Sequence, residues 1–397
     1  MKHQTIKIAI IAAEDSGDLL AADLMHNLST KHENIEFIGV GGAKMLAAGL
    51  NLIADNKEFA IMGIAEVVKK LPRLLKLRKY IVNQILKAQC DLFIGVDAPD
   101  LNFPIEKKLK KHKIKIIHYV SPSIWAWRPK RAIKISQITD LVLTLFPFEP
   151  PYYQKSGGNA VFVGHPLADR IELKIDKDKA KSDLNLKQNS PVLALLPGSR
   201  NNELKAHTTL FLQAAEKLRR QNPDLQIVSA NTSEEKINFI RSKAAALGIE
   251  VLFFNDATKV LKAANMALLA SGTVALEAML CKTAMVVAYK ISPITYGIVK
   301  TFNMMLLPYY SLPNVMYEGF LVPEVMQKDL TVDRLYQELT QLLHPNKLCK
   351  LQQEFLTMHK QLQSNNHNAC HYVWEFIKNN KIIPTQKHEQ TKEQNDD

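Results

Sequence analysis

The sequence predicts an α/β protein made of two doubly wound, Rossmann-like parallel sheets that face a cleft, followed by C-terminal helices. Three observations support this fold class. Short runs rich in Ile and Val alternate with segments of helical periodicity, which is typical of parallel βα units. The chain has 397 residues, which is long for one core and sufficient for two domains. A polar, weakly periodic stretch, "LKIDKDKAKSDLNLKQNS" at 173–190, separates the two series of units.

Apolar runs bounded by turn residues define the expected strands. In the first series they fall at 6–12, 35–40, 91–96, 114–120, 139–145 and 160–163. In the second they fall at 192–196, 225–230, 250–254, 265–270 and 284–289, and residues 331–378 have helical periods that break at "LHPNK". We therefore expect an N-terminal domain at 1–172, a linker at 173–190, a C-terminal domain at 191–345, a helix at 346–380 and a disordered tail at 381–397.

The composition limits the classes of protein and partner. Four scattered cysteines lack the spacing of a metal site and predict reduced thiols. The first apolar run is short, so it predicts a strand rather than a signal peptide, and no run approaches the ~20 residues that cross a bilayer. These features favour a cytoplasmic protein. The net charge of +12 indicates an anionic partner, which is a nucleic acid, a membrane surface or a phosphorylated substrate.

The stretch "LALLPGSRNNEL" at 193–204 is a strand followed by a loop and a helix. Gly198 permits a tight turn, Ser199 can cap the next helix, and Arg200 stands at the helix start. Free backbone N–H groups and a guanidinium together can clamp a phosphate. The alternative is an ordinary βα turn with a solvated arginine.

A second strand-end loop, in "LLASGTVALEAML" at 268–280, begins a helix with Ser271, Gly272 and Thr273. Thr273 and Glu277 are four residues apart and share a helical face. A carboxylate there can accept hydrogen bonds from a ribose diol, as acids do in dinucleotide folds. The alternative is a capped core helix with a surface glutamate.

Together the two loops supply both halves of a grip for a nucleotide diphosphate. Neither loop is a Walker A motif, and no GxGxxG follows a strand, so a nucleotide sugar fits better than ATP or NAD. Asn314, in "YYSLPNVMYEG", could reach across the cleft, although an asparagine that shapes a turn is the simpler interpretation.

In the first series, "CDLFIGVDAPDLNFP" at 90–104 is a buried strand that ends in Asp97. An acid at the end of a core strand points into the cleft and suits general-base chemistry. The alternative is a helix-capping or loop-bracing role, but Asp100 and Asn102 are already available as helix caps. We therefore interpret Asp97 as catalytic.

Two further loops in this half have open interpretations. "AAEDSGDLLAADL" at 12–24 contains Glu14, Ser16, Gly17 and Asp18, and its acids favour contacts to sugar hydroxyls or helix capping over phosphate binding. "HYVSPSIWAWRPKR" at 118–131 interleaves Trp and basic residues. That loop could stack on bases, cover a sugar or an acyl chain, or simply pack.

The stretch 62–87 is amphipathic and basic. Its apolar arc includes Val67, Val68, Leu71, Leu74 and Leu75, and Lys69, Arg73, Lys76 and Lys79 lie on the other side. Such a helix suits the surface of an anionic membrane, whereas its alternative role is an ordinary helix packed on a sheet. Pro72 is expected to begin a second helix or kink the first.

The motifs occur in an order that resembles lipid-A-disaccharide synthases over roughly residues 5–320. The matching stretches are "ExSGD" at 14–18, "MGIxEV" at 62–67, "GVDAPDLN" at 95–102, "HYVSPSIWAW" at 118–127, "GHP" at 164–166, "LPGSRxxE" at 196–203, "SGTVALE" at 271–277 and "SLPN" at 311–314. The resemblance implies a GT-B hexosyltransferase, peripheral on the cytoplasmic face of a Gram-negative inner membrane. Such enzymes transfer the sugar of UDP-2,3-diacylglucosamine to the 6-hydroxyl of 2,3-diacylglucosamine 1-phosphate, which gives a β-1′,6 linkage with inversion and releases UDP.

The resemblance also implies roles for individual residues. Asp97 would be the base, Arg200 with Gly272 and Thr273 would meet the departing diphosphate, and Glu277 would hold the ribose. Ser199, Ser271 and Asn314 would contribute to the donor site; the acceptor side would be Glu14, Ser16, Gly17 and Asp18; and the membrane contact would be Val67, Val68, Leu71, Leu74 and Leu75. No metal or other cofactor is expected, and the only DxD, at Asp176 and Asp178, lies in the polar linker. A homodimer is compatible with the sequence.

Two alternatives remain open. Another UDP-sugar transferase or an epimerase would share Arg200 and Glu277 but would not need the amphipathic stretch. A nucleic-acid-binding protein would explain the net charge, but it would leave Asp97 and Glu277 without a role, so we expect no nucleic-acid partner.

Overall fold

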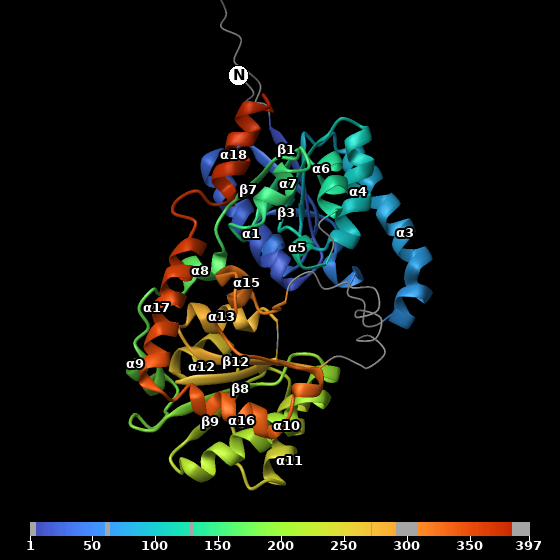
Figure 1. Ribbon diagram of the computed structural model, residues 1–397. Helices are drawn as coiled ribbons and strands as arrows, with labels where there is room; N and C mark the ends of the chain where they lie inside the picture. The colour runs from blue at the N-terminus through green and yellow to red at the C-terminus, as the bar shows by residue number, and fades with distance from the viewer. Residues whose placement is uncertain (1–4, 60–63, 128–129, 271, 291–307, 383–397) are drawn as a thin grey trace, which may run out of the picture. The chain divides into compact units, whose positions relative to one another are not determined.

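The structure is a computed structural model that describes residues 5–59, 64–127, 130–270, 272–290 and 308–382, except for the side chains of residues 64–71 and 127 (Figure 1). The chain forms two compact units. Unit 1 comprises residues 1–164 and 364–397, and unit 2 comprises residues 165–363.

Unit 1 is built on a seven-stranded parallel sheet with the order β3-β2-β1-β4-β5-β6-β7. Its strands are β1 (Ile6–Ala12), β2 (Ile35–Gly41), β3 (Leu50–Asp55), β4 (Leu92–Val96), β5 (Lys115–Tyr119), β6 (Leu141–Thr144) and β7 (Ala160–Phe162). The sequence does not predict β3, because this edge strand exposes several of its side chains. Otherwise the continuous Ile- and Val-rich runs are strands that are buried on both faces, as expected for a parallel sheet.

Helices cover both faces of this sheet. One core joins the strands to α1 (Asp15–Lys31) and α18 (Ala369–Asn379), and a second core joins the opposite face to α3 (Ile64–Lys87) and α4 (Pro99–Lys111). The remaining helices are α2 (Ala43–Ala47), η1 (Asn56–Phe59), α5 (Ile124–Trp127), α6 (Arg131–Ile138) and α7 (Pro150–Gln154). Helix α1 follows β1 on one face of the sheet, and α4 follows β4 on the other. The strand order therefore reverses between β1 and β4. Open α/β sheets bind ligands at such a switch point.

Unit 2 has a six-stranded parallel sheet with the order β10-β9-β8-β11-β12-β13. Its strands are β8 (Val192–Leu196), β9 (Gln226–Ala230), β10 (Leu252–Phe254), β11 (Met266–Ala270), β12 (Ala284–Tyr289) and β13 (Glu324–Met326). Its helices are α8 (Pro166–Arg170), α9 (Lys177–Asp183), α10 (Asn201–Gln221), α11 (Glu234–Ala245), α12 (Ala257–Ala263), α13 (Val274–Leu280), α15 (Leu312–Tyr317), η2 (Gln327–Asp329), α16 (Val332–Gln341) and α17 (Pro345–Leu362). The corresponding switch point lies between β8 and β11.

The predicted fold class of two doubly wound sheets is confirmed, but the structure divides the chain differently from the prediction. The expected linker at 173–190 contains helix α9. Asp176 caps that helix by accepting the N–H of Lys179 at 2.9 Å, and the buried Lys181 Nζ donates to the carbonyls of Gln188 and Ser190. The polar sequence concealed this order because hydrogen bonds hold the segment, both within itself and to Ala264 and Gln226 of unit 2.

The C-terminal region also differs from the single helix expected at 346–380. It forms α17 in unit 2 and then α18, which belongs to unit 1. Val373, Phe376 and Ile377 of α18 are buried in the core that contains α1. Most of the tail predicted to be disordered, residues 383–397, lies outside the described residues.

A nucleotide-sized pocket and a strand-end carboxylate

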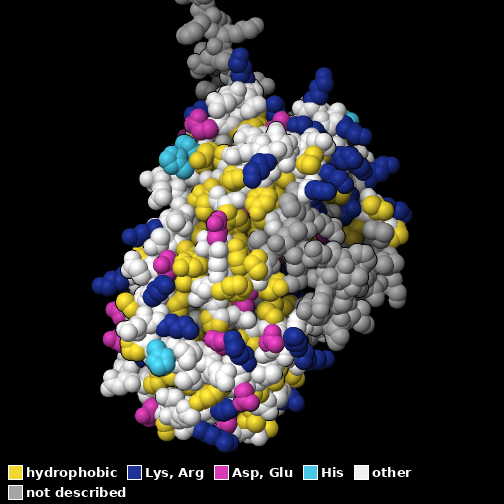
Figure 2. Space-filling view, in the orientation of Figure 1, with side chains coloured by type: hydrophobic (Ala, Val, Ile, Leu, Met, Phe, Trp, Pro, Cys, Tyr) yellow, Lys and Arg dark blue, Asp and Glu magenta, His cyan; other side chains and the backbone are white. Residues whose placement is uncertain are grey.

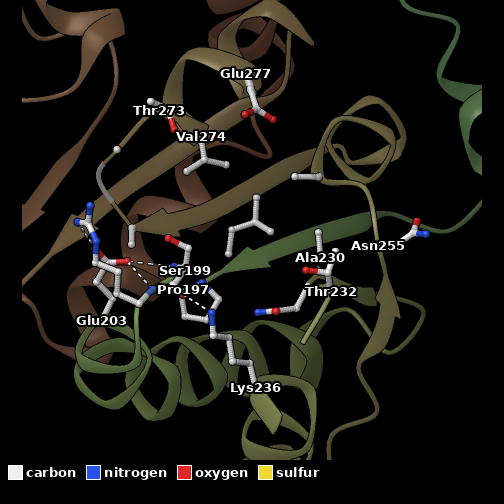
Figure 3. A pocket seen from close by; sticks show the side chains of 17 residues that line it. Pro197, Ser199, Glu203, Ala230, Thr232, Lys236, Asn255, Thr273, Val274 and Glu277 are labelled. Atoms are coloured by element: carbon white, nitrogen blue, oxygen red, sulfur yellow. Dashed lines mark hydrogen bonds and ion pairs between the residues drawn. The ribbon is translucent and has the colours of Figure 1, made fainter. Parts of the chain in front are cut away.

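A pocket of about 540 Å³ opens at the carboxyl edge of the unit 2 sheet (Figure 3). Residues from the ends of β8, β9, β10 and β11 and from the following helices line it. Of the predicted donor-site residues, Ser199, Arg200, Gly272, Thr273 and Glu277 all belong to its lining. Ser271 lies outside the described residues. The pocket thus lies at the switch point between β8 and β11, where the topology predicts a ligand.

The loop after β8 is held by Glu203, which the sequence reasoning did not select. Its Oε2 accepts the backbone N–H groups of Ser199 at 3.0 Å and Arg200 at 3.2 Å. Gly198 has φ +123°, and a Cβ there would lie 2.5 Å from the Cβ of Glu203, so the close turn requires glycine. The prediction of free amides in this loop is therefore corrected, because the Ser199 and Arg200 amides already have a carboxylate partner.

His207 of α10 also holds this loop. Its Nδ1 hydrogen-bonds to the carbonyl of Pro197 at 3.0 Å, and its Nε2 accepts the N–H of Lys290 at 3.0 Å. This pattern requires a neutral ring with the proton on Nδ1. Burial lowers the pKa of His207, which favours that neutral form. The loop is therefore fixed to both α10 and the end of β12.

Two cations lie at the pocket. The Arg200 side chain is 81% exposed and contacts Oε1 of Glu203 at 3.3 Å, so it can reorient toward a ligand. Lys236 of α11 donates to the Ser199 carbonyl at 2.6 Å, and Figure 3 shows it beneath the Pro197–Ser199 turn. The sequence alone did not indicate Lys236, because its role depends on how α11 packs beside α10.

Glu277 lies on the opposite side of the pocket, on α13 (Figure 3). The carboxyl is partly buried and accepts a hydrogen bond from Thr258 Oγ1 at 3.4 Å. Burial raises its pKa, the Thr258 hydrogen bond lowers it, and the nearby Asp256 raises it further. A Cβ added to Gly272 would have no heavy atom of the described residues within 4 Å, so none of these residues obstructs the start of α13.

Asn314 is not part of this pocket. It is fully buried, its Nδ2 donates to the Val322 carbonyl at 2.9 Å and to Glu324 Oε1 at 2.8 Å, and its Oδ1 accepts the N–H groups of Leu321 and Val322. These four bonds use the full capacity of the amide. The expectation that Asn314 assists at the nucleotide is therefore replaced by a structural role in the loop before β13.

In unit 1, Asp97 directly follows β4 at the carboxyl edge of the sheet. Asp97 and Ala98 both have left-handed backbone, with φ +51° and +42°. Asp97 N–H donates to the Tyr119 carbonyl at 2.8 Å, and its partly buried carboxylate accepts no hydrogen bond from any residue that the structure describes. The loop after β1 is adjacent, because Ala12 pairs with Val96 in the sheet.

The four predicted acceptor-side residues divide into two groups. Glu14 and Ser16 are exposed at the start of α1, and Gly17 is buried where a Cβ would lie 3.3 Å from the Cβ of Ala12. Asp18 is buried, and its carboxylate accepts the N–H groups of Gly42, Lys44 and Met45 at 2.6–3.2 Å. Asp18 therefore holds the start of α2 and is not free for a substrate.

Residues 64–87 of the amphipathic stretch form one helix, α3, with Pro72 inside it. The side chains of Val67, Val68 and Leu71 lie outside the described part of the structure. Leu74 is buried and Leu75 is 53% exposed, so the predicted contact residues do not all point outward.

Trp125 lies in the Trp- and Arg-containing loop at 118–131. It is buried and packs edge-on against Phe148 with ring centroids 5.4 Å apart. For Trp125 the structure therefore supports the interpretation that this loop packs.

Comparisons with known proteins show which family the chain is similar to. A family model described as Lipid-A-disaccharide synthetase matches residues 8–375. Lipid-A-disaccharide synthases from Xanthomonas campestris and Xylella fastidiosa are each 44% identical, over 90% and 91% of this chain and 83% and 95% of their own lengths.

Solved structures support the fold alone. A putative UDP-N-acetylglucosamine 2-epimerase from Listeria monocytogenes has a TM-score of 0.63 at 13% identity, covering 95% of this chain and 97% of that one. A glycosyltransferase from Rickettsia africae has a TM-score of 0.56 at 14% identity, covering 96% and 99%. The two sheets are thus those of the GT-B fold. On the family match and these relatives, the chain belongs to the lipid-A-disaccharide synthetase family and is a hexosyltransferase of lipid A biosynthesis.

Proposed function

We propose that the protein transfers 2,3-diacylglucosamine from its UDP donor to the 6-hydroxyl of 2,3-diacylglucosamine 1-phosphate, with a β-1′,6 linkage and inversion. The observation that carries this proposal is the pocket at the unit 2 switch point, which has cations on one side and Glu277 on the other. A carboxylate can accept ribose hydroxyls while guanidinium and ammonium groups meet a diphosphate. The family identity supplies the sugar and lipid class.

In this mechanism Asp97 takes the proton from the acceptor 6-hydroxyl as its oxygen attacks the anomeric carbon. The bond between that carbon and the β-phosphate oxygen breaks, and its electron pair leaves with UDP. Arg200, together with Gly272 and Thr273 at the start of α13, stabilises the developing negative charge. With these groups in place, we propose that the reaction needs no metal ion, so activity should persist in a chelator.

Both proposed substrates carry acyl chains, which places the reaction at a membrane surface. No helix within the described ranges is long and apolar enough to cross a bilayer. We propose peripheral attachment at the cytoplasmic face of the inner membrane through α3, whose described part exposes Leu75, Tyr80 and basic side chains. A basic helix with exposed apolar residues is suited to an anionic lipid interface.

The test is disaccharide 1-phosphate formation in detergent micelles containing both substrates. Asp97→Asn should lower kcat by roughly 10²–10⁴-fold, because it removes a general base, and should leave UDP affinity unchanged. Asp100→Asn is the matched control, since that side chain is 98% exposed on the same segment. A wild type that binds UDP but forms no disaccharide would refute the proposed reaction, and full activity in Asp97→Asn would refute the base.

A further inference from the structure

The turn that carries Asp97 has an unfavourable backbone. Ala98 has φ +42° and ψ +59°, and Asp97 before it is also left-handed. Residues with a Cβ avoid this region, and a non-glycine pair in it persists only where surrounding contacts hold it. Glycine would allow the same turn without the steric conflict, so this backbone sets the direction of the Asp97 Cα–Cβ bond at the cost of local strain.

Asn102 supplies the contacts that hold this turn. Its side chain is fully buried on the first turns of α4. Its Nδ2 donates to the Asp97 carbonyl at 2.8 Å and to the Val96 carbonyl at 3.3 Å. The backbone N–H of Asn102 also donates to the Ala98 carbonyl at 3.0 Å. One residue therefore contacts three successive carbonyls across the strained segment.

A buried polar pair lies behind Asn102. Glu106, one turn further along α4, and His118 of β5 are both fully buried, and Glu106 Oε1 lies 2.7 Å from His118 Nδ1. Gly95 makes room for this arrangement, because a Cβ there would lie 3.1 Å from Asn102 Cβ and would collide with Glu106 Oε1. Glu106 Oε2, His118 Nε2 and Asn102 Oδ1 have no hydrogen-bond partner among the described residues.

Burying these groups is unfavourable, because each has an atom without a hydrogen-bond partner among the described residues. Apolar residues of similar size would pack α4 on the sheet without the desolvation penalty. Glu106 and Asn102 are one turn apart on α4, and both lie against Gly95 of β4, two residues before Asp97. This position beside the turn that bears Asp97 favours a role in orienting one carboxylate over a role in the general stability of unit 1.

We propose that Asn102 is a positioning residue that holds the Asp97 turn in its productive conformation, with the Glu106–His118 pair as its buried support. The inference rests on the proposed role of Asp97 as the base. Catalysis by a general base requires the carboxylate at hydrogen-bonding distance from the hydroxyl, and small displacements there reduce the rate strongly.

The experiment uses Asn102→Asp, which keeps the side-chain shape and removes the donor, and Asn102→Ser, which is too short to reach both carbonyls. Each should lower kcat by about 10–100-fold, with both KM values within about 3-fold of wild type and with unchanged UDP affinity. Asn27→Asp is the matched control, because exposed Asn27 of α1 also donates to a backbone carbonyl, that of Asp23, at 2.7 Å. The control should behave as wild type.

A second readout separates positioning from folding. Combined with Asp97→Asn, the Asn102 variants should cause no further loss, because the group that they orient is already gone. An equal loss in both backgrounds, or full activity of folded Asn102→Asp, would overturn the inference while the proposed function stood. A wild type without disaccharide synthesis would overturn the proposed function and this inference with it. Thermal unfolding and UDP binding identify the variants that fold. If Asn102→Asp does not fold, the same comparison with Asn102→Ser tests the inference.

Discussion

At the scale of the residue, the burial of Glu277 affects its proposed contact with the nucleotide. Its carboxyl is partly buried on α13, and burial, the largest influence, raises its pKa above the usual value of 4.5. The ionised form is the one that can accept two hydroxyl groups from a ribose. Proton binding to Glu277 therefore competes with the proposed nucleotide contact.

This competition predicts that UDP binding weakens as the pH falls through the raised pKa of Glu277. A charge-assisted hydrogen bond contributes about 1.5–3 kcal/mol, so affinity should fall by at least about tenfold across that range. Calorimetric titration with UDP between pH 4 and pH 8 measures this change in affinity. Glu277→Gln is the control, because it retains the titration of the UDP phosphate and lacks that of the carboxyl. Parallel pH profiles for the two proteins would show that Glu277 does not contact the nucleotide.

The same scale shows which site residues the sequence can predict. Ser199, Arg200, Gly272, Thr273 and Glu277 follow two strands, and the ends of parallel strands meet at one sheet edge, so their assembly was predictable. Glu203 accepts backbone N–H groups three and four residues before it, and a glutamate at the third position of a helix is a local signal that could have indicated this contact. The contacts of His207 and Lys236 depend instead on how α10 and α11 fold against the loop, which no local pattern contains. The motif around Asn314 does not reveal whether its amide faces a ligand or its own loop. The structure shows that it faces its own loop.

At the scale of the element, α2 is a five-residue helix that local propensity cannot stabilise alone. Its first amides are unpaired within the helix, as at every helix start. The Asp18 carboxylate from α1 accepts three N–H groups in this region. A side chain predicted to contact substrate thus joins two secondary-structure elements.

Asp18→Ala should therefore destabilise unit 1 by about 1.5–3 kcal/mol, the range for hydrogen bonds to a charged group. For a unit of this size the corresponding fall in Tm is about 3–12 °C, measurable by calorimetry. Asp15→Ala is the control, because Asp15 is exposed in the same first turn of α1. An unchanged Tm in Asp18→Ala, together with a raised KM for the acceptor, would restore the predicted substrate role.

The sequence also predicts some secondary-structure elements and not others. The apolar runs located all the described strands except β3 and β13. β3 lacked the apolar pattern, and β13 has only three residues. Helix α9 was concealed by its polar composition, and α18 by its sequence position, because only the folded chain shows that it packs in unit 1. Local pattern determines an element, but tertiary contacts determine which core it joins.

At the scale of the whole molecule, the net charge of +12 is unevenly displayed. Figure 2 shows Lys and Arg side chains gathered over α3 and α4 of unit 1. Arg73, Lys76, Lys79, Lys107, Lys108 and Lys111 of these helices are exposed. A patch of one sign attracts an anionic surface more strongly than the same charge spread over the molecule.

The proposed membrane contact predicts that Lys76→Glu with Lys79→Glu reduces binding to anionic phospholipid vesicles by at least about tenfold, since each basic residue near such a surface contributes about 1 kcal/mol. Lys347→Glu with Lys350→Glu is the matched control, because these exposed residues of α17 in unit 2 give the same change in charge. Vesicle co-sedimentation at about 0.1 M salt keeps the Debye length near 10 Å, where the patch still acts. If both pairs weaken binding equally, net charge alone attracts the protein, and α3 is an ordinary helix packed on its sheet. A loss confined to the α3 pair would identify this helix as the face that meets the lipid.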